Sequence, residues 1–157
     1  MTIARRLILD RIKVALEGID GTGVYVSTVD TVHRHARTWN ETRFDDRISV
    51  CIAPRLETYR YQPANMLRVE FIVDLLAFVN AATDSEDARI NAINDLLDDM
   101  IAAVHANQTW RGASNTDQQA IATSIVEAET DEADFEGQET IRLSIKVIYD
   151  RTIGVTA

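Results

Sequence analysis

Residues 65–104 read NMLRVEFIVDLLAFVNAATDSEDARINAINDLLDDMIAAV, and this stretch decides the fold. Apolar and polar side chains alternate in its first part, which is the period-two pattern of a strand with one buried face. The apolar positions of this central strand are Leu67, Val69, Phe71, Val73 and Leu75, and the charged positions between them are Arg68, Glu70 and Asp74.

The second part of the stretch predicts an amphipathic helix that ends near residues 105–107. Thr83 and Glu86 have the spacing of a capping box, with Thr83 as the N-cap. A strand and a helix that each have one apolar side bury those sides against each other, so we expect a sheet with helices packed on one face. The apolar residues at helical spacing are Ile90, Ile93, Leu96, Leu97, Met100, Ile101 and Val104.

Before the central strand, the pattern predicts one helix and further strands. Apolar residues recur on one face over residues 3–19, and Gly21 and Gly23 follow where the helix should end. A strand is expected from Val24 to about Val32.

The next strand is predicted to lead into a hairpin. Ile48–Ala53 form a short apolar run that Pro54 should end or bulge, because proline donates no hydrogen bond to a sheet. The strand is expected to resume over Leu56–Tyr61, and residues 62–65 look like the hairpin turn into the central strand.

After the second helix, Trp110 is expected to pack back on the core, and a second, long hairpin should follow. Its strands are predicted over residues 120–130 and 138–150, and residues 152–157 should be frayed. The predicted fold class is therefore α+β, with a mixed, mainly antiparallel sheet of about four to five strands, two helices on one face and a long hairpin.

Composition indicates one compact domain over residues 1–157, since 46% of the residues are hydrophobic. No run approaches the roughly 18 apolar residues of a membrane span, and the N-terminus lacks a signal-peptide core. The single cysteine, Cys51, lies in an apolar strand pattern, where core packing in a reducing compartment is the expected role.

The net charge of -9 is unevenly distributed along the chain. Residues 1–70 carry a net charge of +2, whereas residues 71–157 carry -11. Two interpretations remain open: like subunits that meet head to tail, or a solvated acidic surface that aids solubility. An isoelectric point near 4.7 argues against a broad phosphate-binding surface.

Residues 33–47 form a long segment without periodicity, and segments of this kind often carry function. Arginine and aromatic residues are typical of protein interfaces and of nucleic-acid stacking platforms. Acidic residues nearly cancel the arginines here, so a protein contact or a solvated loop is favoured over nucleic-acid binding. The residues concerned are Arg34, Arg37, Arg43 and Arg47, with Trp39 and Phe44, against Glu41, Asp45 and Asp46.

No residue pattern predicts a metal site, a cofactor or an enzyme. His33 and His35 lack further ligands nearby, and the acidic tip of the second hairpin lacks the spacing of a calcium loop. Phosphate-loop, nucleophile-elbow and zinc-protease motifs are absent from the sequence. The tip carries four carboxylates, Asp131, Glu132, Asp134 and Glu136.

The order of elements resembles the tail terminator proteins of long-tailed bacteriophages, the lambda-type tail terminator family. The segments that carry the resemblance are residues 67–73, residues 123–127 and, beyond the acidic turn, residues 141–149. It covers roughly residues 3–149 and rests on pattern and order, since the family has no short diagnostic motif.

The resemblance implies a structural virion protein without cofactor or catalytic residue. Such a protein is assembled in the host cytoplasm and forms a homo-oligomeric ring, a hexamer, at the head-proximal end of the tail tube, where it ends tube growth. The tail tube protein and a neck or head-completion protein would be its partners, and DNA would pass through the ring without specific binding.

Under this interpretation, two groups of residues become candidate contacts. Arg34, Arg37, Trp39, Arg43 and Phe44 would contact the neighbouring subunit or the tube. Asp131, Glu132, Asp134 and Glu136 would face a partner or the lumen. The alternatives are another neck, head-tail connector or tail completion protein, and a small nucleic-acid-binding module that uses residues 33–47.

Overall fold

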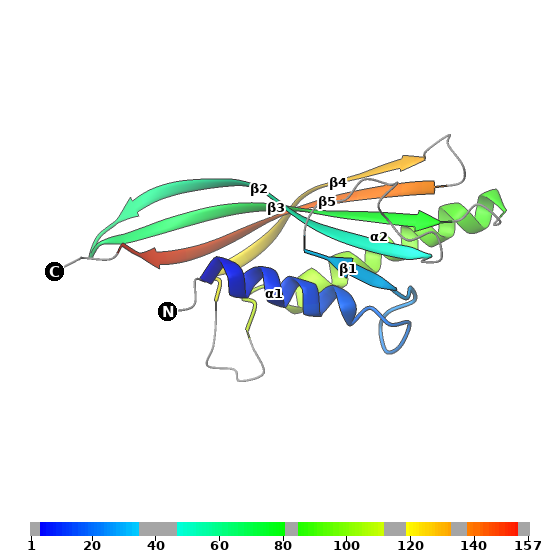
Figure 1. Cartoon of the computed structure of the whole chain (residues 1–157), viewed down its shortest axis with the longest axis horizontal. Coiled ribbons are helices and arrows are strands. Elements are labelled where there is room, and N and C mark those ends of the chain that lie inside the picture. The colour runs from blue at the N-terminus through cyan, green and yellow to red at the C-terminus, as the bar shows by residue number, and fades with distance from the viewer. Residues whose placement is uncertain (1–3, 35–46, 81–84, 112–118, 133–137, 154–157) are drawn as a thin grey trace.

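The computed structural model describes residues 4–34, 47–80, 85–111, 119–132 and 138–153. Both helices lie on one face of a five-stranded sheet of order β1-β2-β3-β5-β4 (Figure 1). Only the β1–β2 pair is parallel, so the predicted α+β fold with a mixed, mainly antiparallel sheet is confirmed. The elements are α1 (Ala4–Glu17), β1 (Thr31–His33), β2 (Ile48–Gln62), β3 (Met66–Asn80), α2 (Glu86–Ala106), β4 (Ala122–Glu132) and β5 (Gln138–Thr152).

The central strand is β3, which pairs with β2 on one side and β5 on the other. Its predicted alternation is confirmed, because every second side chain from Val69 to Val79 is fully buried. The helices cover this face with apolar side chains at helical spacing, and β5 adds its own alternating row. The buried contributions are Ile8, Ile12 and Leu16 from α1, Ile93, Leu96 and Met100 from α2, and Ile141, Leu143, Ile145 and Val147 from β5.

The strand expected over Val24–Val32 is wrong for most of its length, since β1 comprises only Thr31–His33. Val24 and Val26 are mostly exposed instead. The reason is a competing set of hydrogen bonds: the amides of Val26 and Ser27 donate to the Asp99 carboxylate of α2, at 3.0 and 2.6 Å. Those amides therefore bind a helix side chain rather than a neighbouring strand.

Pro54 was expected either to end the strand or to cause a bulge, and in the structure it lies at a β-bulge while β2 continues beyond it. The register against β3 shifts between Pro54 and Leu56, and pairing then continues to Gln62. The predicted turn is confirmed: Ala64 and Asn65 both adopt left-handed backbone conformations, with φ of 65° and 55°. Two consecutive left-handed residues match the twist that antiparallel strands require of a tight hairpin.

The N-cap of α2 is Ser85, not Thr83, which lies outside the described residues. The Ser85 hydroxyl accepts a hydrogen bond from the Ala88 amide at 3.3 Å, and Glu86 and Asp87 complement the helix dipole in the first turn. The helix ends at Ala106, as predicted. No helix in the described ranges is both long and apolar enough to cross a membrane.

Trp110 packs on the core as expected and is 1% exposed. Its indole Nε1–H donates to the Thr123 hydroxyl at 2.8 Å, which joins the segment after α2 to β4. The prediction that residues 152–157 are frayed is wrong for Thr152 and Ile153. Thr152 pairs with Met66 of β3, and the Ile153 amide donates a hydrogen bond to the Asn65 carbonyl at 2.8 Å. Residues 154–157 lie outside the described residues.

The buried Asp99 carboxylate is predicted to hold the 20–28 segment on α2. Asp99→Ala leaves the amides of Val26 and Ser27 without their acceptor, so the free energy of unfolding should fall by about 2 kcal/mol. Chemical denaturation checks this. The neighbouring Asp98→Ala is the matched control, since Asp98 is exposed and should cost less than about 0.5 kcal/mol. Equal costs at the two positions would contradict the assigned role.

Candidate assembly interface

The sheet is longer than the helices that cover it. Strands β2, β3 and β5 have 15 residues each, or about 50 Å at the rise of an extended chain. Helix α1 has 14 residues, or about 21 Å. The strands therefore project beyond the first turn of α1 at the end that carries the β2–β3 turn (Figure 1). We call this projection, residues 56–69 and 148–153, the arm.

The face of the arm that continues the core carries exposed aromatic side chains. Tyr59 lies opposite Val69, whose side chain is core, so Tyr59 and Tyr61 point to the helix side of the sheet. They are 50% and 83% exposed because the helices end before them. Leu67 and Arg151 lie in the same row as Tyr61. We call Tyr59, Tyr61, Leu67 and Arg151 the arm patch.

Glu57 joins the arm to α1 at the point where the helix begins. Its carboxylate pairs with the Arg5 guanidinium at 3.1 Å and accepts hydrogen bonds from the hydroxyls of Tyr59 and Tyr149. Arg5 also lies over the ring of Phe71, 5.1 Å from its centroid, in cation–π geometry. Three donors thus satisfy one nearly buried carboxylate, which fixes the first turn of α1 on the base of the arm.

Two tyrosines at this junction have raised pKa values. Burial raises the pKa of Tyr149 to about 12, and the negative charge of Glu57 adds to the effect. The hydrogen bond to Glu57 raises the pKa of Tyr59. Because the folded state favours the neutral Tyr149 phenol, its contribution to stability is complete below pH 10 and is lost as the pH rises through about 12.

Glu57→Gln should lower the pKa values of both Tyr59 and Tyr149, since it removes the charge that disfavours their ionisation. Absorbance at alkaline pH reports tyrosinate formation by the four tyrosines of the chain. The matched control is Glu70→Gln, the same charge change on the other face of the sheet, which should leave the titration unchanged. A Glu57→Gln curve that overlays the wild type would rule out the junction as described.

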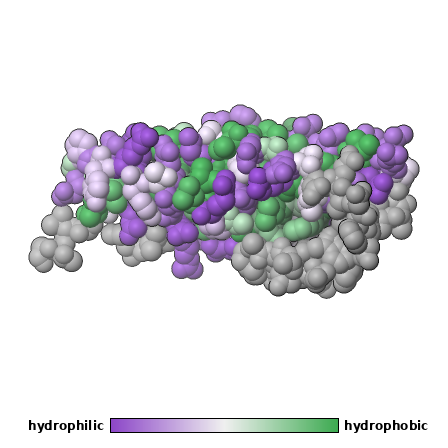
Figure 2. Space-filling model, turned by 90° about the horizontal axis from the view of Figure 1, so that it is seen from above, coloured by the Kyte–Doolittle hydropathy of each residue, from purple (hydrophilic) through white to green (hydrophobic). Residues whose placement is uncertain are grey.

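The helix-free face of the sheet mixes apolar and charged groups (Figure 2). The buried carboxylate of Asp74 accepts a hydrogen bond from the Ser144 hydroxyl at 2.6 Å and pairs with Arg55 at 3.1 Å. Arg142 bridges Glu127 and Glu129 at 3.2 and 2.7 Å. A pocket of about 270 Å³ lies beside it, lined by Leu76, Ala77, Phe78, Glu129, Thr140, Ile141 and Arg142.

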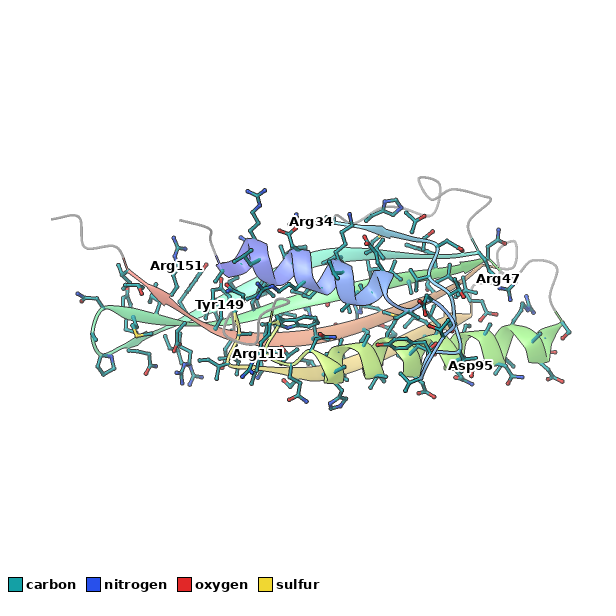
Figure 3. All side chains as sticks on the ribbon, turned by 90° about the horizontal axis from the view of Figure 1, so that it is seen from below. Arg34, Arg47, Asp95, Arg111, Tyr149 and Arg151 are labelled. Atoms are coloured by element: carbon teal, nitrogen blue, oxygen red, sulfur yellow. The ribbon has the colours of Figure 1, made fainter. Side chains whose placement is uncertain are left out.

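The side of α2 that faces away from the core is acidic. Asp87, Asp95 and Asp98 lie on the side of α2 opposite its buried residues, and Asp98 and Asp87 are exposed. Figure 3 shows Asp95 near one end of the molecule, and Tyr149 and Arg151 toward the other. The structure therefore separates a patch with exposed tyrosines and an arginine from a patch of carboxylates.

The structure describes part of the residue groups predicted from the sequence. Arg34 is exposed at the end of β1 and pairs with Asp10 of α1. Arg37, Trp39, Arg43 and Phe44 lie outside the described residues. Their assignment as contacts stays a prediction.

The acidic tip is described only where β4 ends. The backbones of Asp131 and Glu132 pair with Thr140 and Glu139 of β5. Asp134 and Glu136 lie outside the described residues, so the role of the tip also stays a prediction.

Sequence reasoning missed the arm patch. The pattern predicts a strand over Leu56–Tyr61, but Tyr59 and Tyr61 have the same alternation as core residues. The available signal was length: two strands of 15 residues joined by a tight turn cannot be covered along their whole length by a helix of 14 residues. Among the described residues, no group of three or more His, Cys, Asp or Glu side chains could hold a metal ion.

The fold is that of a small α+β domain whose mainly antiparallel sheet has one helix-covered face and one projecting arm. Comparison with protein-family models finds no match. A search of curated protein sequences finds none either.

A solved structure shares the fold. It is a chain in the virion of a native gene transfer agent particle, which matches with a TM-score of 0.51 and 10% sequence identity. The match covers 92% of this chain and 92% of that chain. The likeness therefore extends over nearly the whole of both chains, and at this identity it establishes the fold.

Proposed function

We propose that the protein is a structural component of a phage-like virion and acts as a tail terminator. It would form a ring at the head-proximal end of the tail tube, end the growth of the tube and present a surface to the neck. The observation that carries the proposal is the fold shared with a virion chain over 92% of both chains. The order of elements resembles the tail terminator family, and this resemblance supports the specific position proposed in the tail.

The surface of the described residues supports an assembly role. A closed ring of identical subunits uses two different surfaces on each subunit, because each contact joins one surface of one copy to another surface of the next. The arm patch and the acidic side of α2 are two such surfaces, and they differ in charge and apolar character. Exposed tyrosine and arginine are residue types that concentrate binding energy at protein interfaces.

The proposed partners follow from the position in the tail. One side of the ring would contact the tail tube protein, and the other would contact a neck or head-completion protein. DNA would pass through the lumen, and no cofactor or catalytic group is needed for any of these contacts. In this proposal Arg34, Arg37, Trp39, Arg43 and Phe44 are contacts with the next subunit or with the tube.

The mass of the purified protein in solution tests the proposal first. Light scattering behind a sizing column, across concentration and salt, should show a ring-sized species, or a monomer that becomes a ring when tail tube protein is added. A ring that ignores tube protein would favour another neck or connector protein. A strict monomer that ignores tube protein but shifts in mobility with DNA would overturn the proposal in favour of a nucleic-acid-binding module.

We propose further that the acidic tip faces the lumen and repels passing DNA, as its four carboxylates suggest. Replacing Asp131, Glu132, Asp134 and Glu136 together by lysine should then slow DNA ejection, because a cationic lumen would bind phosphate groups. The matched control replaces the same residues by their amides, Asn and Gln, and should slow ejection less. Assembly and ejection that are unchanged by the lysine variant would show that the tip does not face DNA.

A further inference from the structure

We infer that the arm patch of one copy of this chain binds the acidic side of α2 on the next copy. The inference rests on the proposed ring assembly and names the two surfaces that would meet in it. We call the second surface the α2 stripe: Asp87, Asn91, Asn94, Asp95 and Asp98, which follow one another along a single side of the helix.

The first argument is that the arm has cations without anionic partners. Most arginines of the described sheet form salt bridges within the chain. Arg68 forms a bidentate salt bridge with Asp150, Arg55 pairs with Asp74, and Arg142 pairs with Glu127 and Glu129. Arg151 in the arm patch is exposed and forms no ion pair with any other described residue. Its charge is therefore available to a partner.

The second argument is that the α2 stripe has anions without cationic partners. Within the described part of the chain, no basic side chain pairs with Asp87, Asp95 or Asp98. The basic residue of α2 in its first half, Arg89, instead lies 3.9 Å from Glu139 of β5. The stripe lies opposite the buried side of the helix, so it faces away from the core.

The third argument is the distance between the two surfaces. Arg151 lies toward one end of the elongated molecule and Asp95 toward the other (Figure 3). One copy cannot join its own arm patch to its own α2 stripe, but two copies can meet head to tail. Such a contact is heterologous, because it joins two different surfaces. When it repeats from copy to copy, it forms a closed ring if the rotation between neighbouring copies brings the last copy back to the first.

The two kinds of residue in the arm patch would contribute differently. Tyr59 and Tyr61 supply apolar area that loses contact with water on binding, and aromatic side chains of this kind anchor interfaces. The pairing of Arg151 with the carboxylates of the stripe would select the partner surface and its orientation. Both contributions are needed, because exposed ion pairs alone are weak and are screened by salt.

A charge exchange between two variants tests the inference. Arg151→Glu reverses the arm patch, and the double substitution Asp95→Arg with Asp98→Arg reverses the α2 stripe. Each variant alone should need at least about tenfold higher concentration to assemble, because like charges then face each other. An equimolar mixture should assemble as the wild type does, because every contact in an alternating ring again joins opposite charges. Sedimentation velocity across concentration, with tube protein added if the wild type requires it, gives the readout.

The matched control is Arg60→Glu. Arg60 lies on the same arm, is exposed, and undergoes the same change of charge, but it points to the other face of the sheet. It should assemble like the wild type. All these positions lie outside the core, so thermal unfolding of the variants should stay close to that of the wild type, which separates lost assembly from lost folding.

The outcomes separate the inference from the proposed function. If the wild type assembles and the reversed variants do so equally well, the two named surfaces are wrong and the ring proposal stands. Variants that lose assembly without rescue in the mixture would also overturn the inference. A wild type that stays monomeric at every concentration, with and without tube protein, would overturn both.

Discussion

Strand β3 is hydrogen-bonded to a neighbour on each side over nearly its whole length, and the remaining structure depends on this double pairing. Because side chains alternate along a strand, a shift of one residue in either register would turn the row from Val69 to Val79 away from the helices. The fully buried row is thus the constraint that fixes β2 and β5, and through them the position of every other strand. Both helices then pack on the face that this row defines.

The other face of β3 shows how the sheet tolerates polar groups. Asp74 is buried there, and a hydroxyl and a guanidinium supply the contacts that a buried carboxylate requires. Between such groups lie Ile72, Leu76 and Phe78, which are half-buried. An antiparallel sheet commonly has one face packed on helices and one in contact with solvent or a partner, and the composition of this face agrees with that division.

The sequence allowed most of the fold to be predicted, because the strongest signals were local. Alternation in β3 and β5 and helical spacing in α2 need only neighbouring residues. The failures depended on contacts between distant residues: Val24 and Val26 have strand-forming side chains, yet the Asp99 carboxylate, 73 residues beyond Val26, takes the amide of Val26. The cap was misplaced because Thr83 and Ser85 are both good N-cap residues and only the first helical turn distinguishes them.

The candidate interface was harder to predict for a related reason. Tyr59 and Tyr61 repeat the alternation of the core, so their exposure depends on where α1 begins relative to the strands, which no local pattern records. The uneven charge along the chain did not indicate the two patches, because Arg151 and Asp95 both lie in its acidic half and only the fold places them toward opposite ends.

The net charge of the chain bears on when such a contact could form. Each copy carries a net charge of -9, so two free copies that approach each other experience a net electrostatic repulsion. Salt screens this repulsion and the attraction between an arginine and a carboxylate surface over the same distance of about 10 Å, so both act only between copies that are close together. Under the proposed head-to-tail contact, a tail tube that holds copies side by side would raise their local concentration and so offset this repulsion. Arg151 and the carboxylates of the α2 stripe would then orient neighbouring copies at the end of a completed tube, so the tube would favour ring formation without being required for it.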